Sequence, residues 1–571
     1  MARSKHDWTG TVRLAENLGQ AESKAVAAAL AAWSAHNNVG RLWAHDKRLW
    51  TGADEDKWLG WLDIATRERA DVAALDAVTR AATARRDVVL IGMGGSSLGP
   101  DVIARGFGHR EGWPRFHMLD STDPAQIAAI EHAIDPANTL FIVSSKSGTT
   151  LEPNILEDYF FARVGAEAGS QFVAVTDPGS AMEKKARQRG FAQVFFGDPQ
   201  IGGRYSVLSK FGLVPATAIG VDVAGLLDAT ETMARLCQGA GEDNPGLRLG
   251  LALGTLAKEF RRDKVTILTS PRIASLGSWL EQLIAESTGK QGKGLVPVDS
   301  EPVAAPDDYG NDRVFIYVAL SGDDDDSQSN AIDVLALAGH PVLRLAFDDM
   351  IQLGQVFFLA EIATAVAGAV IGINPFDQPD VEASKVKTRA LTDAYEKSGT
   401  LPTEKPFFET DGIALFADAE NEKALAKGKS LAEILRTHIA RAGAGDYLAL
   451  LAYIERNAEH TAILTALRVA LRHAAKCATC VGFGPRFLHS TGQAYKGGPN
   501  SGVFLQITAD PAHDLAVPGK KYSFGLVEAA QAQGDFAVLT ERKRRALRVH
   551  LSNVDTGLGT LVRAVHESLT R

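Results

Sequence analysis

Short runs of Val, Ile, Leu and Phe alternate along the chain with longer segments that are rich in Ala and charged residues. The run at 87–91 leads directly into a glycine-rich turn, and similar runs lie at 116–119, 139–143, 172–175 and 193–196. Strands that alternate with helices in this way are typical of a parallel sheet with right-handed crossovers. The pattern therefore predicts an α/β domain over residues 87–221.

The same alternation restarts after a stretch at 222–262 that predicts connecting helices. Strands are expected at 265–268, 314–320 and 342–346, with helices at 274–287 and 352–371, which gives a second α/β domain over residues 263–395. In both domains the helix after the first strand opens with Ser-Leu-Gly, at 97–99 and at 275–277. The identities are too few to decide between a duplication and chance.

Segments of different character flank these two domains. Residues 1–86 place Trp and Leu at helical spacing and predict helices throughout. Residues 396–571 predict a third α/β segment with strands at 447–454, 502–507 and 536–539, and the four acidic residues at 323–326 predict a solvated loop. An apolar run at 356–373 carries one charge, Glu361, and lies at the lower length limit of a membrane span. Since it continues the α/β pattern, it predicts a buried core helix.

Composition narrows the classes of function. The 571 residues are 45% hydrophobic, and the net charge of −9 excludes a global basic field for nucleic acid or an anionic membrane. Three cysteines do not make a disulfide framework, and the polar N-terminus lacks the apolar core of a signal peptide, which together predict a reducing cytosol. Cys477 and Cys480 lie on a segment expected to be helical and are interpreted as a buried structural pair, because zinc usually takes four ligands.

Two turns between a strand and a helix have the composition of an anion site. Gly-Gly-Ser-Ser at 94–97 is glycine-rich, and Ser-Ser-Lys-Ser-Gly-Thr-Thr at 144–150 carries five hydroxyls and a lysine. Backbone N–H groups in such turns, with the positive end of the following helix, bind phosphate. Ordinary helix capping is the alternative, but it uses one or two hydroxyls. The composition therefore favours a phosphate site.

The first of these turns also begins something like a dinucleotide fingerprint. Gly92 and Gly94 follow a strand, and Asp120 ends a strand downstream. However, Ser97 stands where the third Gly or Ala should be. A near-match of this kind is weak support for an NAD-dependent dehydrogenase.

Three further motifs follow the two turns in a fixed order. These are Gly-Gly-Arg-Tyr-Ser at 202–206, Glu-Ser-Thr-Gly-Lys at 286–290, and Asn-Pro-Phe-Asp-Gln-Pro at 374–379 with Val381, Glu382 and Lys385. The ordered set resembles the sugar-isomerase (SIS) domains of the glucose-6-phosphate isomerase family. The resemblance implies an α/β fold of two SIS-type parallel-sheet domains flanked by helices, here with a helical N-terminal segment and an appended C-terminal α/β segment. It also implies that the protein interconverts glucose 6-phosphate and fructose 6-phosphate, without a metal or a redox cofactor.

One motif departs from the family order. The histidine associated with ring opening is expected between the glutamate segment and the closing motif, yet residues 291–374 contain only His340. Leu-His-Ser-Thr-Gly-Gln lies instead at 488–493, followed by Lys-Gly-Gly-Pro-Asn at 496–500. This late position resembles the isomerase half of bifunctional transaldolase/glucose-6-phosphate isomerase proteins. We expect the third α/β segment to deliver His489 to the active site.

The resemblance also implies a set of site residues. Those implied to bind the substrate are Gly95, Ser96, Ser145, Lys146, Ser147, Thr150, Gln282 and Gln378, and those implied in catalysis are Arg204, Glu286, Lys385 and His489.

The chemistry of the reaction fits these residue types. Proton transfer between C1 and C2 needs a positioned base, and Glu286 lies one helical turn after Gln282 on the same face. A surface ion pair between Glu286 and Lys290 is the alternative. Arg204 suits the charge of a cis-enediolate, and His489 with Lys385 suits ring opening.

Other functions remain open at this point. A non-catalytic SIS module that senses a sugar phosphate, an NAD-dependent dehydrogenase, and an isomerase of another 6-substituted hexose are the alternatives. The expected partner is a small sugar phosphate, with no nucleic acid and no membrane. A homodimer and an association with a transaldolase are both compatible with the resemblance.

Overall fold

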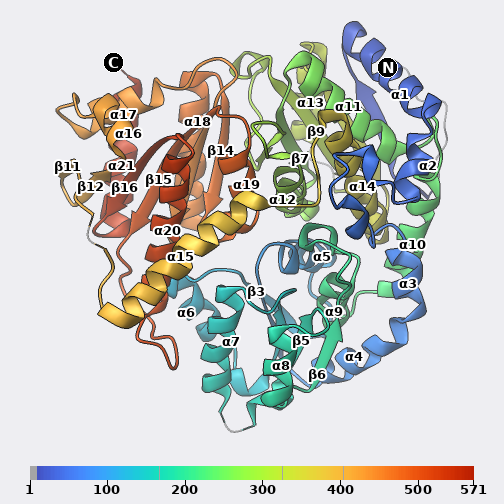
Figure 1. Cartoon of the computed structure of the whole chain (residues 1–571), viewed down its shortest axis with the longest axis horizontal. Helices are drawn as coiled ribbons and strands as arrows, with labels where there is room; N and C mark the ends of the chain where they lie inside the picture. Colours follow the sequence, from blue (N-terminus) through green and yellow to red (C-terminus); the bar gives the residue numbers. More distant parts are fainter. Residues whose placement is uncertain (1–9, 166, 324–325, 403, 571) are drawn as a thin grey trace.

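Three open sheets form the frame of the molecule, and each lies in its own lobe (Figure 1). The computed structural model describes residues 10–165, 167–323, 326–402 and 404–570. In Figure 1 the first lobe lies at the bottom, the second at the upper right beside the N-terminus, and the third at the upper left beside the C-terminus.

The first lobe contains a fully parallel sheet in the order β3-β2-β4-β5-β6. Its strands are β2 (Asp87–Gly92), β3 (Arg115–Leu119), β4 (Thr139–Ser144), β5 (Phe172–Thr176) and β6 (Gln193–Phe196). Its helices are α5 (Leu98–Phe107), α6 (Pro124–Ala133), α7 (Leu151–Val164), α8 (Ala181–Gln188) and α9 (Lys210–Ala218). The central strands β2 and β4 are buried along their whole length, which explains why their sequences are continuous apolar runs. All five strands predicted for this lobe are confirmed.

The second lobe has the strand order β1-β10-β9-β7-β8. Its strands are β1 (Arg13–Asn17), β7 (Lys264–Thr269), β8 (Val296–Asp299), β9 (Arg313–Leu320) and β10 (Val342–Phe347). Its helices are α10 (Val223–Leu236), α11 (Pro245–Phe260), α12 (Leu276–Thr288), α13 (Asp326–Leu337) and α14 (Leu353–Ile371). Of the acidic stretch predicted as a loop, residues 324–325 lie outside the described residues and Asp326 already begins α13.

The prediction that the N-terminal segment is helical throughout is wrong. Helices α1 (Gln20–Ala35), α2 (Asn38–Trp43), α3 (Ile64–Ala70) and α4 (Asp76–Thr83) are present. However, β1, the first strand among the described residues, pairs antiparallel with β10 and so belongs to the second lobe's sheet. This pairing joins residues that are more than 300 positions apart, and a five-residue strand carries no local signal that announces such a partner.

The apolar helix α14 lies inside the second lobe. The segment Met350–Ile371 is long and apolar enough to cross a membrane, but 83% of its most apolar window is buried within the fold. Helices α10, α11 and α12 all pack against α14, and its aromatic residues belong to the core shared by the first two lobes. The prediction of a buried core helix is confirmed.

The third lobe has the strand order β11-β12-β16-β15-β13-β14, with β13 to β16 parallel. Its strands are β11 (Phe408–Thr410), β12 (Ile413–Phe416), β13 (Tyr447–Tyr453), β14 (Ala478–Phe483), β15 (Gly502–Ala509) and β16 (Arg545–Leu551). Its helices are α16 (Ala419–Leu425), α17 (Leu431–Ile439), α18 (Ala458–Ala475), α19 (Gly492–Gly497), α20 (Phe524–Glu541) and α21 (Val554–Leu569). The long helix α15 (Pro379–Ser398) leads into this lobe and packs along α20 (Figure 1).

Two predictions for this lobe are wrong. The apolar run at 536–539 is not a strand but part of α20, which a side chain of Ser523 caps and which is buried on several sides. Cys477 and Cys480 are both buried but are not on a helix, since Cys477 directly precedes strand β14 and Cys480 lies in its buried first half. Short apolar runs do not distinguish a buried helix from a buried strand, and both errors have this origin.

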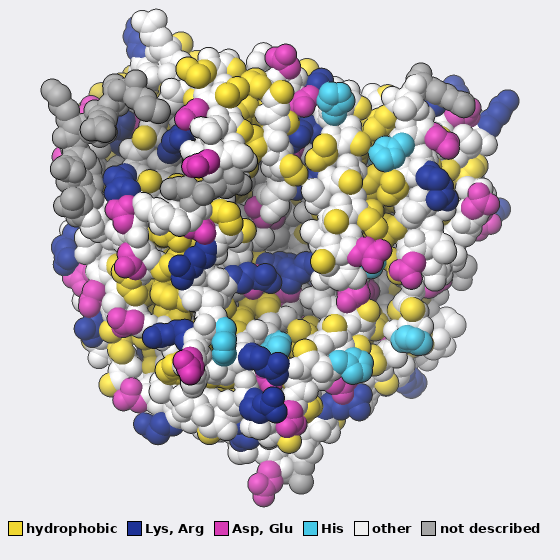
Figure 2. Space-filling view, turned by 180° about the vertical axis from the view of Figure 1, so that it is seen from behind, with side chains coloured by type: hydrophobic (Ala, Val, Ile, Leu, Met, Phe, Trp, Pro, Cys, Tyr) yellow, Lys and Arg dark blue, Asp and Glu magenta, His cyan; other side chains and the backbone are white. Residues whose placement is uncertain are grey.

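Acidic and basic side chains are interspersed on the face opposite to the view of Figure 1. Figure 2 shows this face hollowed near its centre, with several Lys and Arg side chains gathered there. Local clusters of cations therefore exist on a molecule whose net charge is −9.

Candidate active site

A cavity of about 730 Å³ lies where the three lobes meet. The first lobe contributes the loops after β2, β4 and β6, the second contributes α12, and the third contributes His489. All twelve site residues named from the sequence line this cavity: Gly95, Ser96, Ser145, Lys146, Ser147, Thr150, Arg204, Gln282, Glu286, Gln378, Lys385 and His489. Segments far apart in the chain thus converge on one place.

The hydroxyl-rich loop connects β4 to α7 at one end of the cavity. Thr150 occupies the N-cap position of α7, but its side chain makes no capping hydrogen bond. Gly148 has φ +70°, and a Cβ there would lie 2.2 Å from the backbone nitrogen of Met182, so that only glycine fits this turn. Because the Thr150 hydroxyl is not used for capping, it is available to an anion at the helix N-terminus.

Lys146, unlike the hydroxyl residues beside it in the loop, forms an ion pair within the protein. Its ammonium donates to Asp177 Oδ2 at 2.6 Å and to the carbonyl of Asp198 at 2.8 Å. Burial raises the pKa of the Asp177 carboxyl, although the contact with Lys146 opposes this effect. Lys146 therefore borders the loop as part of an ion pair.

A close backbone contact joins the two glycine-rich segments. The turn η4 (Gly94–Ser96) packs against η7 (Gly203–Tyr205), and a Cβ on Gly95 would lie only 1.9 Å from the carbonyl oxygen of Gly203. Glycine at position 95 thus allows the loop that carries Arg204 to approach the cavity floor.

Arg204 is buried, with 2% of its surface exposed, and its guanidinium is fully engaged by the protein. The partners are Ser287 Oγ at 2.8 Å, Gln378 Oε1 at 2.8 Å, Glu286 Oε2 at 3.4 Å, and the carbonyl oxygens of Pro375 at 2.7 Å and Asp377 at 3.1 Å. Five contacts match the five N–H bonds of an arginine. Arg204 therefore orients Glu286 and Gln378 and places a fixed positive charge beside them.

Glu286 and Gln282 project from α12 into the cavity, as their spacing predicted. Glu286 is buried and Gln282 donates to the carbonyl of His489 at 2.8 Å. Burial raises the pKa of Glu286, while Arg204, His489 and Lys385 oppose that shift. The alternative surface pair is not formed, because Lys290 is buried and donates to Asp377 and to the carbonyl of Asn374. Burial lowers the pKa of Lys290 to about 8.

The third lobe brings His489 to the cavity, at the end of η11 (Arg486–His489). Its Nε2 lies 2.9 Å from Oε1 of Glu152, a residue in the first turn of α7 that sequence reasoning missed. Gln531, on α20, donates to the same carboxylate oxygen at 2.6 Å. Burial alone would raise the pKa of Glu152, but the contact with His489 holds it below its ordinary value.

The sequence contained one weak signal for Glu152. It is an acidic residue two positions after the hydroxyl-rich loop, in the first turn of a helix, where a carboxylate would oppose a bound phosphate. Its partner His489 lies 337 positions further along the chain, so the pair itself was not readable from the sequence.

Lys385 is the most exposed of the four residues implied in catalysis. It projects from α15, its side chain is 39% exposed, and its Nζ lies 3.7 Å from Oε2 of Glu382. The side chain is therefore able to reach a ligand in the cavity without breaking a buried contact.

Asp120 does not serve a dinucleotide site. It is buried and pairs with Arg486 at 2.6 Å and with Arg456 at 3.4 Å, both from the third lobe. It does not line the cavity. Its role is to join the first and third lobes next to His489. Within the described residues, no three His, Cys, Asp or Glu side chains form a group suited to a metal ion.

Comparisons with known proteins agree on one family. The model of the phosphoglucose isomerase family matches residues 69–304. A glucose-6-phosphate isomerase from Rubrobacter xylanophilus is 31% identical over 383 residues, which cover 58% of this chain and 85% of the relative. The corresponding protein from Heliobacterium modesticaldum is 27% identical over 422 residues, which cover 64% of this chain and 92% of the relative.

Two solved structures share the fold. A hypothetical protein from Thermus thermophilus superposes with a TM-score of 0.55 and 25% identity, covering 66% of this chain and 99% of that one. A glucose-6-phosphate isomerase from Chlamydia trachomatis superposes with a TM-score of 0.50 and 22% identity, covering 64% and 78%. The Rubrobacter xylanophilus relative, 31% identical and covered over 85% of its length, the family model and the order of the motifs together show that the chain belongs to the glucose-6-phosphate isomerase family.

Proposed function

We propose that the protein interconverts glucose 6-phosphate and fructose 6-phosphate in the cytosol, with Glu286 as the base that moves a proton between C2 and C1. The observation that carries this proposal is the convergence of Glu286, Arg204, His489 and the hydroxyl-rich loop on one cavity. Membership of the isomerase family supports the reaction type. The small-molecule partner is the sugar phosphate, which agrees with membership of this family.

The phosphate is held at the hydroxyl-rich loop. Backbone N–H groups, the hydroxyls of Ser145, Ser147 and Thr150, and the N-terminus of α7 provide donors at one point. Because the phosphate dianion is bound at a distance from the reacting carbons, it positions C1 and C2 of the open-chain sugar near Glu286. Ser147→Ala combined with Thr150→Ala should lower kcat/KM for the phosphorylated sugar far more than for the free sugar.

Ring opening requires a proton on the ring oxygen and the loss of a proton from the anomeric hydroxyl. His489, held by Glu152, is placed to exchange a proton with one of these oxygens, and Lys385 provides the second polar group. The Glu152 carboxylate fixes the orientation of the imidazole and balances a positive charge on it. Glu152 is thus a positioning residue.

Isomerisation then passes through a cis-enediolate. Glu286 removes the proton from C2 of the aldose and returns it to C1, while the hydroxyl proton of O2 passes to O1. The negative charge of the intermediate lies near the guanidinium of Arg204. Because all N–H bonds of Arg204 are directed at protein atoms, it acts through its fixed charge and by orienting Glu286 and Gln378. No protein reorganisation is needed as the charge develops.

The test is turnover of fructose 6-phosphate, coupled to glucose-6-phosphate dehydrogenase, in the presence of EDTA. Glu286→Gln should reduce kcat on the order of 10³-fold, within the range of a positioned base. His489→Ala should also reduce it, whereas Glu541→Gln, an exposed carboxylate on α20, should leave it unchanged. If the folded wild-type protein is inactive, the substrate assignment is wrong, and a different 6-substituted hexose or a sensor role takes its place.

A further inference from the structure

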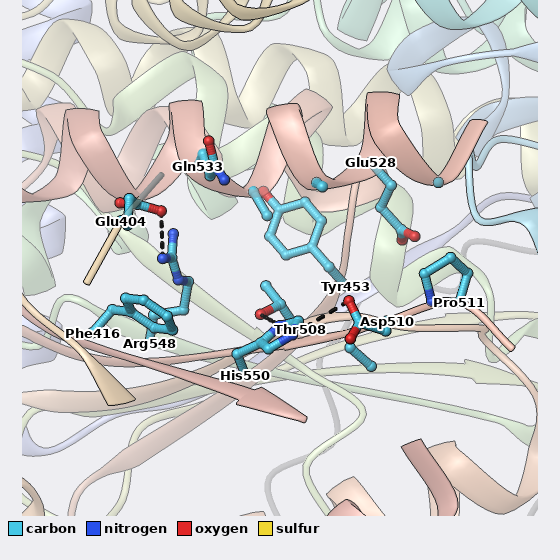
Figure 3. A pocket seen from close by; sticks show the side chains of 14 residues that line it. Glu404, Phe416, Tyr453, Thr508, Asp510, Pro511, Glu528, Gln533, Arg548 and His550 are labelled. Atoms are coloured by element: carbon cyan, nitrogen blue, oxygen red, sulfur yellow. Dashed lines mark hydrogen bonds and ion pairs between the residues drawn. The ribbon is translucent and has the colours of Figure 1, made fainter. Parts of the chain in front are cut away.

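The third lobe contains a second cavity, of about 270 Å³, between α20 and the sheet. It shares no lining residue with the cavity of the proposed isomerase site. Figure 3 shows the helix above, the strands below, and polar side chains pointing into the space between them. Nothing in the proposed isomerase chemistry uses this space.

The position of this cavity is one that ligands favour in α/β folds. Strand β13 pairs with β14 on one side and with β15 on the other, so the chain reverses its direction of winding between β13 and β15. Tyr453, Thr508 and His550 lie at or near the carboxyl ends of β13, β15 and β16, and all line the cavity. Ligands bind in the crevice at the carboxyl ends of parallel strands at such a switch point.

The two basic side chains of the cavity already have acidic partners. Arg548 donates to Glu404 Oε2 at 2.5 Å, and the His550 ring lies 3.4 Å from Asp510 Oδ1 and 3.0 Å from Thr508 Oγ1. Figure 3 shows both pairs, at the left and at the centre of the view. Neither basic side chain is therefore left to attract an anionic ligand strongly.

Glu528 is the opposite case. It is 7% exposed, its Oε1 has no hydrogen-bond partner, and no Lys, Arg or His side chain of the described residues forms an ion pair with it. Burial, with Asp123 and Asp514 nearby, raises the pKa of its carboxyl well above the ordinary value. Burial without a neighbouring cation favours the neutral carboxyl group, and a positive group beside it would favour the ionised carboxylate instead.

The aromatic ring of Tyr453 lies next to this carboxyl group. In Figure 3 the Glu528 side chain descends from α20 towards the sheet, and the ring of Tyr453 lies beside it in the same space. Aromatic faces attract organic cations, and an ammonium group is drawn to a carboxylate in a partly desolvated site. The free volume is sufficient for a compact molecule of a few heavy atoms.

We propose that this cavity binds a small organic ammonium compound, with its charged nitrogen on the Glu528 carboxylate and its body against the ring of Tyr453. Thr508 and Gln533 supply hydroxyl and amide groups for polar substituents on the same ligand. The site is independent of the isomerase reaction and stands even if the substrate assigned above is wrong.

The test compares two probes of nearly equal shape. Tris(hydroxymethyl)aminomethane carries an ammonium group where pentaerythritol carries a hydroxymethyl group. Ligand-detected NMR on the full chain, in a phosphate buffer, should show binding of the first and not of the second. Equal binding of both probes, or no binding of the amine, would overturn the proposal.

Three variants locate the binding. Glu528→Gln should weaken binding of the amine by tenfold or more, on the order expected for loss of a desolvated charge pair, whereas Glu541→Gln, on the same helix but outside the cavity, should not. Ala529 lies exposed at the edge of the cavity, so Ala529→Leu narrows the opening and should also weaken binding while the carboxyl group remains. Binding that survives both Glu528→Gln and Ala529→Leu would place the amine elsewhere and contradict the proposal.

Discussion

At the scale of single residues, burial and charged neighbours decide what each carboxyl group of the active site can do. Glu286 and Glu152 are both buried glutamates that line the same cavity. The pKa of Glu286 is raised because burial outweighs its cationic neighbours, whereas the pKa of Glu152 is lowered because His489 lies in contact with it. The first is suited to taking up a proton, and the second to remaining charged as a fixed partner.

The raised pKa of Glu286 predicts the acid limb of the pH profile. The base works only when ionised, so activity is lost as the pH falls through a pKa that lies above the ordinary glutamate value of 4.5. The kcat/KM of the wild type against pH should show this limb above pH 4.5. Since Arg204 opposes the upward shift, Arg204→Gln should move the limb to still higher pH. A limb at or below 4.5 would argue against Glu286 as the base.

The contact between Glu152 and His489 predicts energetic coupling. Glu152→Gln and His489→Ala should each destabilise the fold, and the double variant should lose less than the sum, by about 0.5–3 kcal/mol. Urea denaturation of the four proteins measures this difference. Glu541→Gln combined with His489→Ala provides the control and should be additive, because Glu541 pairs with Lys387 on α15. Additivity of the Glu152 and His489 variants would show that the pair is not formed in solution.

At the scale of elements, close approach of loops and helices places the side chains. The turn η4 touches η7, which holds Arg204 in position, and α20 carries Gln531, which bonds to Glu152 from a different lobe. Helix α15 carries Lys385 and follows Gln378, whose amide oxygen accepts from Arg204. Four elements without sequence proximity therefore fix the geometry of one site.

The approach of η4 to η7 predicts the effect of one methyl group. A Cβ at position 95 would meet the carbonyl oxygen of Gly203 at 1.9 Å, so Gly95→Ala should push the Arg204 loop away and lower kcat/KM by tenfold or more, on the scale of a misplacement near ~1 Å. Gly202→Ala is the matched change, since a Cβ there meets nothing within 4 Å and its φ of −66° suits alanine. Steady-state kinetics of both variants decide the matter. Similar losses in the two would show that the contact with Gly203 is not the cause.

At the scale of the whole molecule, buried charges join the third lobe to the other two. Glu301, which follows β8, is 1% exposed and accepts from Arg313 of the second lobe and from the backbone and hydroxyl of Thr479 on β14. On the other side, Arg486 pairs with Asp120 of the first lobe. These contacts hold His489 over the cavity that the first two lobes form.

Removal of the Glu301 carboxylate should therefore destabilise the folded protein. Breaking a buried ion pair from one side costs about 3–5 kcal/mol, so Glu301→Gln should lower the free energy of unfolding by that amount. Chemical denaturation measures the loss, and Asp307→Asn, at an exposed position nearby, should change stability by no more than about 0.5 kcal/mol. If Glu301→Gln lowers the free energy of unfolding by no more than about 0.5 kcal/mol, the limit expected for Asp307→Asn, then Glu301 does not join the lobes.

Local pattern in the sequence was sufficient for most of the first two lobes. All five strands of the first sheet and the helices α12 and α14 lie close to where apolar runs placed them. All twelve site residues predicted from the motifs line the active-site cavity. The motifs could be recognised because each combines glycines, hydroxyls or charges that a packed core alone would not need. A hydrophobic run or a glycine-rich turn acts through its immediate neighbours, so it is visible in the sequence.

Only the tertiary structure decided which distant segments meet. The pairing of β1 with β10, the helix that replaced the strand expected at 536–539, and the contact of Glu152 with His489 all depend on partners far along the chain. The same holds for the second cavity, where the unpaired state of Glu528 appears only once its surroundings are known. Burial, charge pairing and the choice between helix and strand for a short apolar run are properties of the packed molecule. They therefore cannot be derived from any single segment of the sequence.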